Sequence, residues 1–154
     1  MKILVCTDGS EQSQKALEEA SKIAEGCNPD EVSIIHVYEG KLDFSSLPRG
    51  EVSAITKEDM DSFRDLQEKH KEESKKILVE ALKIFEEKNI KASTIFKEGH
   101  PAETIIRVAS EKGFDMIVIG SRGLSSLKQL FLGSVCNAVA QGANANVLAV
   151  KMEK

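Results

Sequence analysis

Short apolar runs alternate along the chain with longer stretches in which apolar residues recur every three or four positions. Buried strands are typically apolar runs of about four to eight residues, whereas a period near 3.6 is typical of amphipathic helices. Five runs therefore predict strands, at Lys2–Cys6, Val32–Tyr38, Ala92–Phe96, Met116–Ile119 and Val147–Val150. Because strands and helices alternate strictly, we expect a doubly wound α/β domain, with a five-stranded parallel sheet covered by helices on both faces.

Helical patterns occupy the gaps between these strands. Ser10 is the predicted N-cap of the first helix, whose apolar stripe is formed by Ala16, Leu17, Ala20, Ile23 and Ala24. Pro101 is predicted at the first position of a later helix, where its missing N–H removes no hydrogen bond. Ser134 is predicted to cap the last helix.

The region from about residue 40 to residue 73 departs from this pattern and is interpreted as an insertion in a single domain spanning residues 1–154. Gly40–Thr56 contains a proline, two glycines and scattered apolar residues, which predicts a long loop. Lys57–Asn89 has a helical pattern throughout, and its roughly 33 residues would extend about 50 Å. Because only the second half carries a core stripe, we expect Lys57–Glu73 to project, to bend away or to pack on a partner.

Composition argues against several classes of function. Among 154 residues, 21 Lys and Arg against 25 Asp and Glu give a formal net charge of -4, which disfavours nucleic acid as a partner. The longest apolar runs have four residues, far fewer than the roughly 20 that span a bilayer, and the N-terminus lacks a signal-peptide pattern. We therefore expect a cytoplasmic protein without a membrane span. Cys6, Cys27 and Cys136 show no CxxC spacing, so we expect three thiols, two of them in core-facing elements.

The end of the first strand carries the first candidate for chemistry. In an open parallel sheet, ligands bind in the crevice at the carboxyl ends of the strands. The first strand ends in Thr7-Asp8-Gly9-Ser10, which places a carboxylate at this edge. Asp8 has two interpretations, as a ligand-binding carboxylate or as an Asx-type cap of the following helix.

The second candidate is a glycine-rich segment between the fourth strand and the last helix. Gly120-Ser121-Arg122-Gly123 follows the buried strand, and Gly133-Ser134 opens the helix nine residues later. Glycines allow close backbone approach, a helix N-terminus offers N–H donors and an arginine adds positive charge, which together suit a phosphate. The alternative is that the glycines merely allow tight turns and that Arg122 is solvated. Neither GxxxxGK[ST] nor a strand followed by GxGxxG occurs.

These residues resemble the universal stress protein family. Gly120 to Ser134 is similar to the G-x2-G-x9-G-[ST] motif of that family, and Ile3 to Ser10 and His36-Val37 are similar to its first two strands. The resemblance covers the chain apart from Gly40–Lys69. It implies a Rossmann-like fold of the adenine nucleotide alpha hydrolase type, with strand order 3-2-1-4-5.

The resemblance also implies an adenine-nucleotide site for ATP, ADP or AMP, in which the phosphates themselves mainly hold a Mg2+ ion. Thr7 and Asp8 would lie near the adenosine, with Asp8 toward the ribose, and the backbone around Val37 would meet the adenine. The residues that would approach the ribose and phosphates are Gly120, Arg122, Gly123, Gly133, Ser134, Val135 and Cys136. Most family members resemble dimers joined through the last strand, here Asn146 to Lys151, which as an edge strand invites pairing.

Three interpretations of function remain open at this stage. A nucleotide-binding sensor is favoured, because the motif supplies a phosphate site while no general base stands near the expected γ-phosphate. A slow ATPase is one alternative, and an interaction or dimerisation module that does not depend on nucleotide is the other. A phosphoacceptor receiver domain would need clustered acidic residues at the strand ends, and the strands after the first supply no Asp there. His100 is interpreted as a cap or surface residue outside the site.

Overall fold

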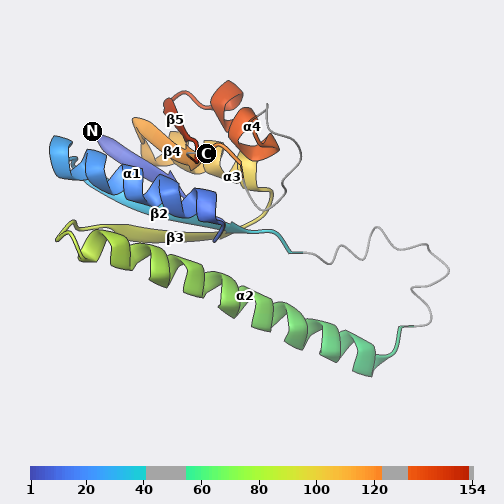
Figure 1. Cartoon of the computed structure of the whole chain (residues 1–154). Helices are drawn as coiled ribbons and strands as arrows, with labels where there is room; N and C mark the ends of the chain where they lie inside the picture. Colours follow the sequence, from blue (N-terminus) through green and yellow to red (C-terminus); the bar gives the residue numbers. More distant parts are fainter. Residues whose placement is uncertain (41–54, 123–131, 153–154) are drawn as a thin grey trace.

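The computed structural model describes residues 1–40, 55–122 and 132–152. Within them, one parallel sheet has the strand order β3-β2-β1-β4-β5, as Figure 1 shows. This order and the doubly wound α/β fold confirm the prediction, and each strand lies within two residues of its predicted bounds. The strands are β1 (Lys2–Cys6), β2 (Glu31–Tyr38), β3 (Ser93–Glu98), β4 (Met116–Gly120) and β5 (Asn146–Val150).

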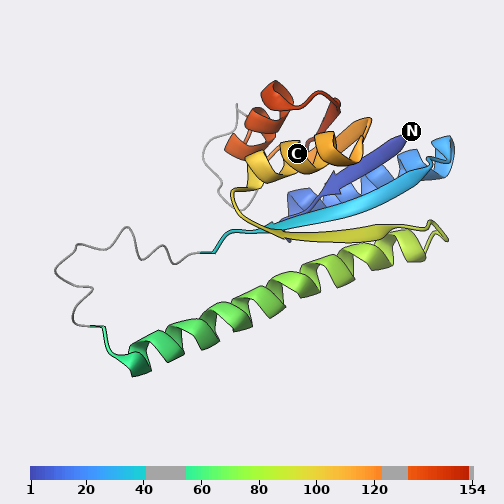
Figure 2. The ribbon, with the colours of Figure 1, turned by 180° about the vertical axis from the view of Figure 1, so that it is seen from behind.

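Helices cover both faces of the sheet, as Figure 2 shows. Each pair of helices closes a separate apolar core. The helices α1 (Glu11–Cys27) and α2 (Lys57–Glu86) pack on one face, where Leu17 and Phe85 are almost fully buried. The helices α3 (Pro101–Lys112) and α4 (Ser134–Gly142) pack on the other face around Val108. Both faces of the central strands are therefore buried, which explains why their sequences are continuously apolar.

The structure confirms two of the predicted helix starts and contradicts the third. Ser10 caps α1 as predicted, because its Oγ accepts a hydrogen bond from the Ser13 N–H at 3.2 Å. Pro101 is the first residue of α3, also as predicted. The predicted capping role of Ser134 is wrong: Gly133 is the N-cap of α4, and Ser134 is the first helical residue. Gly133 has an extended ψ of 157° and Ser134 is already helical, so the helix begins one residue earlier than expected.

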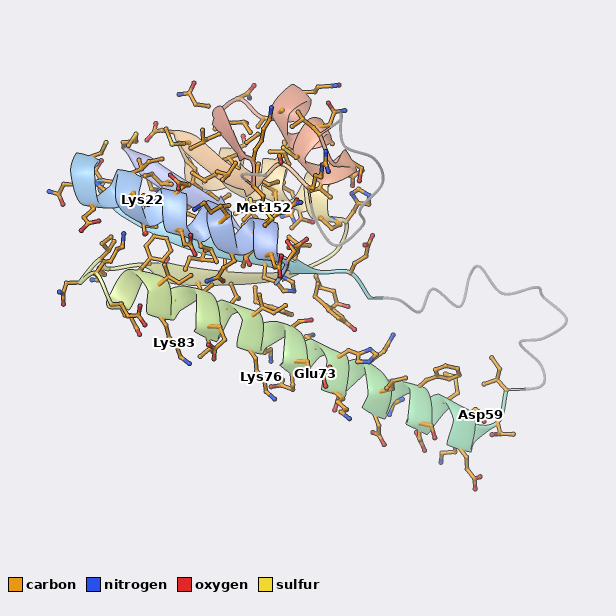
Figure 3. All side chains as sticks on the ribbon, in the orientation of Figure 1. Lys22, Asp59, Glu73, Lys76, Lys83 and Met152 are labelled. Carbon is orange, nitrogen blue, oxygen red and sulfur yellow. The ribbon has the colours of Figure 1, made fainter. Side chains whose placement is uncertain are left out.

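The long helix α2 projects beyond the sheet at its N-terminal end, as Figures 1 and 3 show, with Asp59 near its far end. It is a continuous helix of 30 residues, opened by a capping box in which Thr56 and Asp59 exchange hydrogen bonds. Its buried residues, Leu78, Ala81 and Phe85, all lie in the C-terminal half. Of the three expected arrangements, projection is therefore the one observed. The predicted loop Gly40–Thr56 falls mostly on residues 41–54, outside the described part of the chain.

The strand order places one crevice at the carboxyl end of the sheet. β1 and β4 pair side by side, with Val5 opposite Val118. The chain leaves β1 toward α1 on one face and leaves β4 toward α4 on the other. Helices that leave neighbouring strands in opposite directions open a crevice between them, which is where open α/β sheets bind ligands. Within the described ranges, no helix combines the length and the apolar character needed to cross a membrane.

Candidate functional site

A cavity of about 670 Å³ lies at the carboxyl ends of β1, β2 and β4. Nine of the ten residues predicted for the site line it: Thr7, Asp8, Val37, Gly120, Arg122, Gly133, Ser134, Val135 and Cys136. The tenth, Gly123, lies outside the described residues. Residues more than 100 positions apart in the chain thus meet around one space, while their contacts with a nucleotide stay a prediction.

Asp8 fits both of its interpretations, one for each carboxylate oxygen. Its Oδ1 accepts a hydrogen bond from the Ser10 N–H at 3.0 Å, which is an Asx turn at the start of α1. Its Oδ2 has no hydrogen-bond donor in the described part of the chain. Because Asp8 is half-buried and lines the cavity, this second oxygen is the one available to a ligand.

Thr7 and His36 form a buried connection between β1 and β2 beneath the cavity. The Thr7 hydroxyl lies 3.1 Å from the Ser13 hydroxyl, and the Thr7 carbonyl lies 2.8 Å from His36 Nδ1. Since a carbonyl can only accept, Nδ1 carries the hydrogen and donates it. His36 lines the cavity, yet it was not among the predicted site residues. The signal that could have found it is the histidine within the mainly apolar run of β2.

Two glycines of the motif, Gly120 and Gly133, differ in what the backbone requires of them. At Gly120, an added Cβ would lie 3.0 Å from the Gln12 carbonyl oxygen and 3.1 Å from the Arg122 carbonyl oxygen, so close backbone packing requires glycine. At Gly133, φ is -59° and ψ is 157°, a conformation that any residue adopts. The backbone conformation therefore does not require glycine at position 133.

The N-terminus of α4 opens at the cavity without a side-chain cap. Gly133 has no side chain to accept hydrogen bonds from the first turn, and the first helical bond runs from the Asn137 N–H to the Gly133 carbonyl at 2.9 Å. Among the described residues, the N–H groups of Ser134, Val135 and Cys136 have no acceptor. These N–H groups carry partial positive charge, and a helix start of this kind is able to bind an anion.

Charge is distributed unevenly around the cavity. Arg122 and the start of α4 lie on the β4 side, and in the described part of the chain no carboxylate pairs with the Arg122 guanidinium. Glu39 and Glu73 line the side formed by β2 and α2. Because neighbouring strands are about 4.8 Å apart, the two sides are separated by roughly 10 Å across β1. The cavity therefore suits a ligand that is anionic at one end only.

The sequence of this chain matches a protein-family model and is similar to known proteins, and both similarities include the residues of this site. The model of the universal stress protein family matches residues 1–151. The chain belongs to this family. Universal stress protein YxiE of Bacillus subtilis is 39% identical over 150 residues, which is 97% of this chain and 98% of that protein. Universal stress protein MJ0577 of Methanocaldococcus jannaschii is 34% identical over 97% of this chain and 94% of that protein.

Solved structures show the same fold. The structure of MJ0577 matches with a TM-score of 0.77 at 30% identity, over 99% of this chain and 96% of that chain. A universal stress protein in complex with cAMP matches with a TM-score of 0.63 at 25% identity, over 97% of this chain and 95% of that chain. The five-stranded arrangement described above is thus that of other universal stress proteins.

In this universal stress protein, α2 forms a wall of the cavity that the sequence did not predict. Four of its residues line the space at helical spacing, His70, Glu73, Ser74 and Ile77, and Figure 3 labels Glu73 on this part of the helix. The Ile77 side chain packs against Gly9, where an added Cβ would lie 3.0 Å from Ile77 Cδ1. One feature of the sequence could have indicated this wall. The face of α2 that carries the core stripe continues toward the N-terminus of the helix, where polar residues occupy it.

The three cysteines have different environments. Cys6 and Cys136 are buried at the cavity floor and Cys27 is exposed, which confirms that two of them face the core. Burial raises the pKa of the Cys6 thiol strongly and also raises the pKa of the Cys136 thiol. Both stay protonated and unreactive near neutral pH, since the thiolate is the reactive form.

Thiol labelling should therefore distinguish Cys27 from the other two cysteines. At pH 8 the native protein should react with one equivalent of a thiol reagent per chain, at Cys27, and with three equivalents after unfolding. Mass spectrometry of tryptic peptides would assign the label. Rapid native labelling of Cys6 or Cys136 would contradict the burial of the cavity floor.

Proposed function

We propose that this universal stress protein is a sensor that binds an adenine nucleotide in the cavity at the carboxyl end of the sheet. The observation that carries the proposal is the uncapped start of α4, with its N–H groups and Arg122 on the β4 side of a cavity of about 670 Å³. A solved relative that is 25% identical was crystallised with cAMP, an adenine nucleotide, which supports the same ligand class here.

The chemistry of the cavity fits a nucleotide in one orientation. Its phosphates would accept hydrogen bonds from the first turn of α4 and pair with Arg122, where Gly133 allows close approach. The ribose would lie at Asp8, at the end of β1. The adenine would reach the backbone at Val37, against the apolar wall that Ile105 provides from α3. ATP, ADP and AMP share these groups, and a Mg2+ ion would be held mainly by the phosphates.

The proposed role is binding rather than rapid hydrolysis. Fast hydrolysis requires a group that orients the attacking water at the γ-phosphate. Asp8, the carboxylate at the end of β1, belongs to the ribose side of the proposed orientation, and one of its oxygens is engaged by Ser10. We therefore expect turnover of ATP below about 1 s⁻¹, the low end of ordinary enzymes, in a phosphate-release assay with Mg2+. Faster turnover would favour the ATPase alternative.

The proposed assembly is a homodimer joined through Asn146 to Lys151. The strand β5 is at the edge of the sheet and pairs with β4 along one side, and Leu148 is 36% exposed. An edge strand with open backbone groups is a template for a second strand. A module that acts through this edge without nucleotide is the competing function. If the protein is such a module, a variant that no longer binds nucleotide would still bind its partner protein.

The test is to identify what the purified protein carries. We expect protein prepared without added nucleotide to release, on denaturation, adenine nucleotide approaching one equivalent per chain, identified by chromatography and mass spectrometry. Gly133→Val should release none, because its branched side chain would occupy the phosphate position. Gly26→Val is the matched control, since a Cβ at Gly26 meets nothing within 4 Å and lies outside the cavity.

An empty wild-type protein that also shows no calorimetric binding of ATP, ADP or AMP would contradict the proposal. The interaction module would then be the better description, with the exposed half of α2 as the surface to test. Equal nucleotide content in Gly133→Val and Gly26→Val would place the nucleotide elsewhere in the protein.

A further inference from the structure

The attachment of α2 to the sheet weakens from its C-terminal end toward its N-terminal end. The buried side chains of Leu78, Ala81 and Phe85 fix the C-terminal part in the core. Nearer the N-terminus, the Lys71 ammonium pairs with the Glu98 carboxylate of β3 at 3.2 Å, and both side chains are exposed. Exposed ion pairs of this kind contribute little to stability. The helix around Lys71 is therefore held to the sheet by weak contacts.

Residues 57–69 of α2, the projecting half, extend beyond the sheet, and Figure 3 labels Asp59 near their far end. Met60 and Leu66 in this half are 42% and 48% exposed. Its roughly 13 residues extend about 20 Å. A helix of about this length is only marginally stable in water on its own. The projecting half therefore depends on the attached part of α2 for its helical structure.

The wall segment, residues 70–77, lies between the projecting half and the buried end of α2, and it faces the cavity. Four of its side chains line the space, those of His70, Glu73, Ser74 and Ile77. Ile77 is half-buried and packs against Gly9, in the turn that follows β1. In the proposed function the phosphates lie on the β4 side, so the adenosine end of the nucleotide would lie against the wall segment. A bound nucleotide would therefore connect this segment to the ends of the strands.

We infer that nucleotide binding stabilises the projecting half of α2 without contacting it. This inference rests on the proposed function and adds a conformational response to it. When the wall segment detaches from the sheet, the cavity loses one side, and the projecting half loses the end from which its helix propagates. A ligand that requires the wall disfavours this local opening, and the effect grows with the ratio of ligand concentration to Kd. The wall segment and the projecting half therefore gain stability together.

Amide hydrogen exchange with and without ATP, resolved by residue with NMR spectroscopy, tests this coupling. With ATP at 100 times its Kd, we expect the amides of residues 61–69 to exchange at least about tenfold more slowly, with about 100-fold as the upper limit. The amides of residues 73–77 in the wall segment should slow to the same extent. Residues 110–112, the exposed end of α3, are the internal control, because they lie outside the cavity and should exchange equally fast in both conditions.

Two proline variants test whether the effect travels along the helix. Lys69→Pro interrupts α2 between the projecting half and the wall segment, because proline inside a helix removes a hydrogen bond and clashes with the preceding turn. The wall segment can persist, since proline is accepted at the first position of the shortened helix. Lys57→Pro is the matched control, because Lys57 is already the first helical residue and Thr56 before it is extended. ATP should slow exchange at residues 73–77 in both variants, and at residues 61–68 in Lys57→Pro alone.

The possible failures are distinguishable. A wild-type protein that shows no calorimetric binding of ATP and no change in exchange contradicts the proposed function and this inference with it. A wild-type protein that binds ATP while exchange at residues 61–69 stays unchanged contradicts the inference alone, without need of any variant. Equal slowing of residues 110–112 also overturns it, because the effect would then not be specific to α2. Equal slowing of residues 61–68 in both proline variants does so as well, because the helix would then not carry the effect.

Discussion

Replacing Gly133 with aspartate should strongly weaken nucleotide binding while leaving the empty protein at least as stable as the wild type. The backbone at position 133 accepts any residue, with φ of -59° and ψ of 157°. Aspartate at an N-cap accepts hydrogen bonds from the first turn and favours the helix dipole, together worth about 0.5 kcal/mol relative to glycine. Its carboxylate would then occupy the place proposed for a phosphate, so we expect ATP affinity to fall by at least about 100-fold.

The variant Gly133→Asn distinguishes the effect of the negative charge from the effect of filling the space at position 133. Asparagine caps a helix as well as aspartate does, but it carries no charge. Calorimetric titration with ATP should therefore rank the affinities as wild type, then Gly133→Asn, then Gly133→Asp. Thermal unfolding without nucleotide should show all three proteins within about 2 °C of one another, or the variants higher. An aspartate variant that binds ATP like the wild type would remove the start of α4 from the site.

The parts of this molecule that could be predicted from sequence are those set by local physics. The strands were recognisable because both faces of the sheet are covered, so runs such as Ile3–Val5 are continuously apolar and almost fully buried. Ser10 was predictable because a serine before a helical stripe has one favourable use, as a cap. The glycine motif was recognisable because glycine at strand ends is scarce unless backbone or ligand comes close, and at Gly120 the Gln12 carbonyl does so.

The rest depended on contacts between distant segments. The α2 wall of the cavity exists because the helix continues past the sheet edge, which brings Glu73 and Ser74 to residues of β2 more than 30 positions earlier. His36 gained its role from the Thr7 carbonyl on the neighbouring strand, a partner set by strand pairing. The start of α4 was misplaced by one residue, because Gly133 and Ser134 are both acceptable N-caps and sequence alone does not choose between them.

Phe85→Ala should cause the largest loss of stability of the substitutions considered. Phe85 is 0% exposed and anchors α2 in the core that it shares with α1 and the sheet. Removing a buried phenylalanine ring loses its transfer free energy and leaves a cavity, which together cost about 3–5 kcal/mol. The ring is one of three buried side chains of α2, so a large part of the attachment of this helix depends on it.

Urea unfolding followed by circular dichroism would measure the change in the free energy of unfolding. Val79→Ala is the control on the same helix: Val79 is 57% exposed, so its change should stay within about 0.5 kcal/mol. Because Ile77 and Ser74 line the cavity from α2, a loosened helix should also reduce the stabilisation that saturating ATP gives to the folded protein. A loss below about 1 kcal/mol in Phe85→Ala would mean that α2 is held mainly by its surface ion pairs, such as Lys71 with Glu98. Exposed pairs of that kind are usually too weak to hold a helix in place.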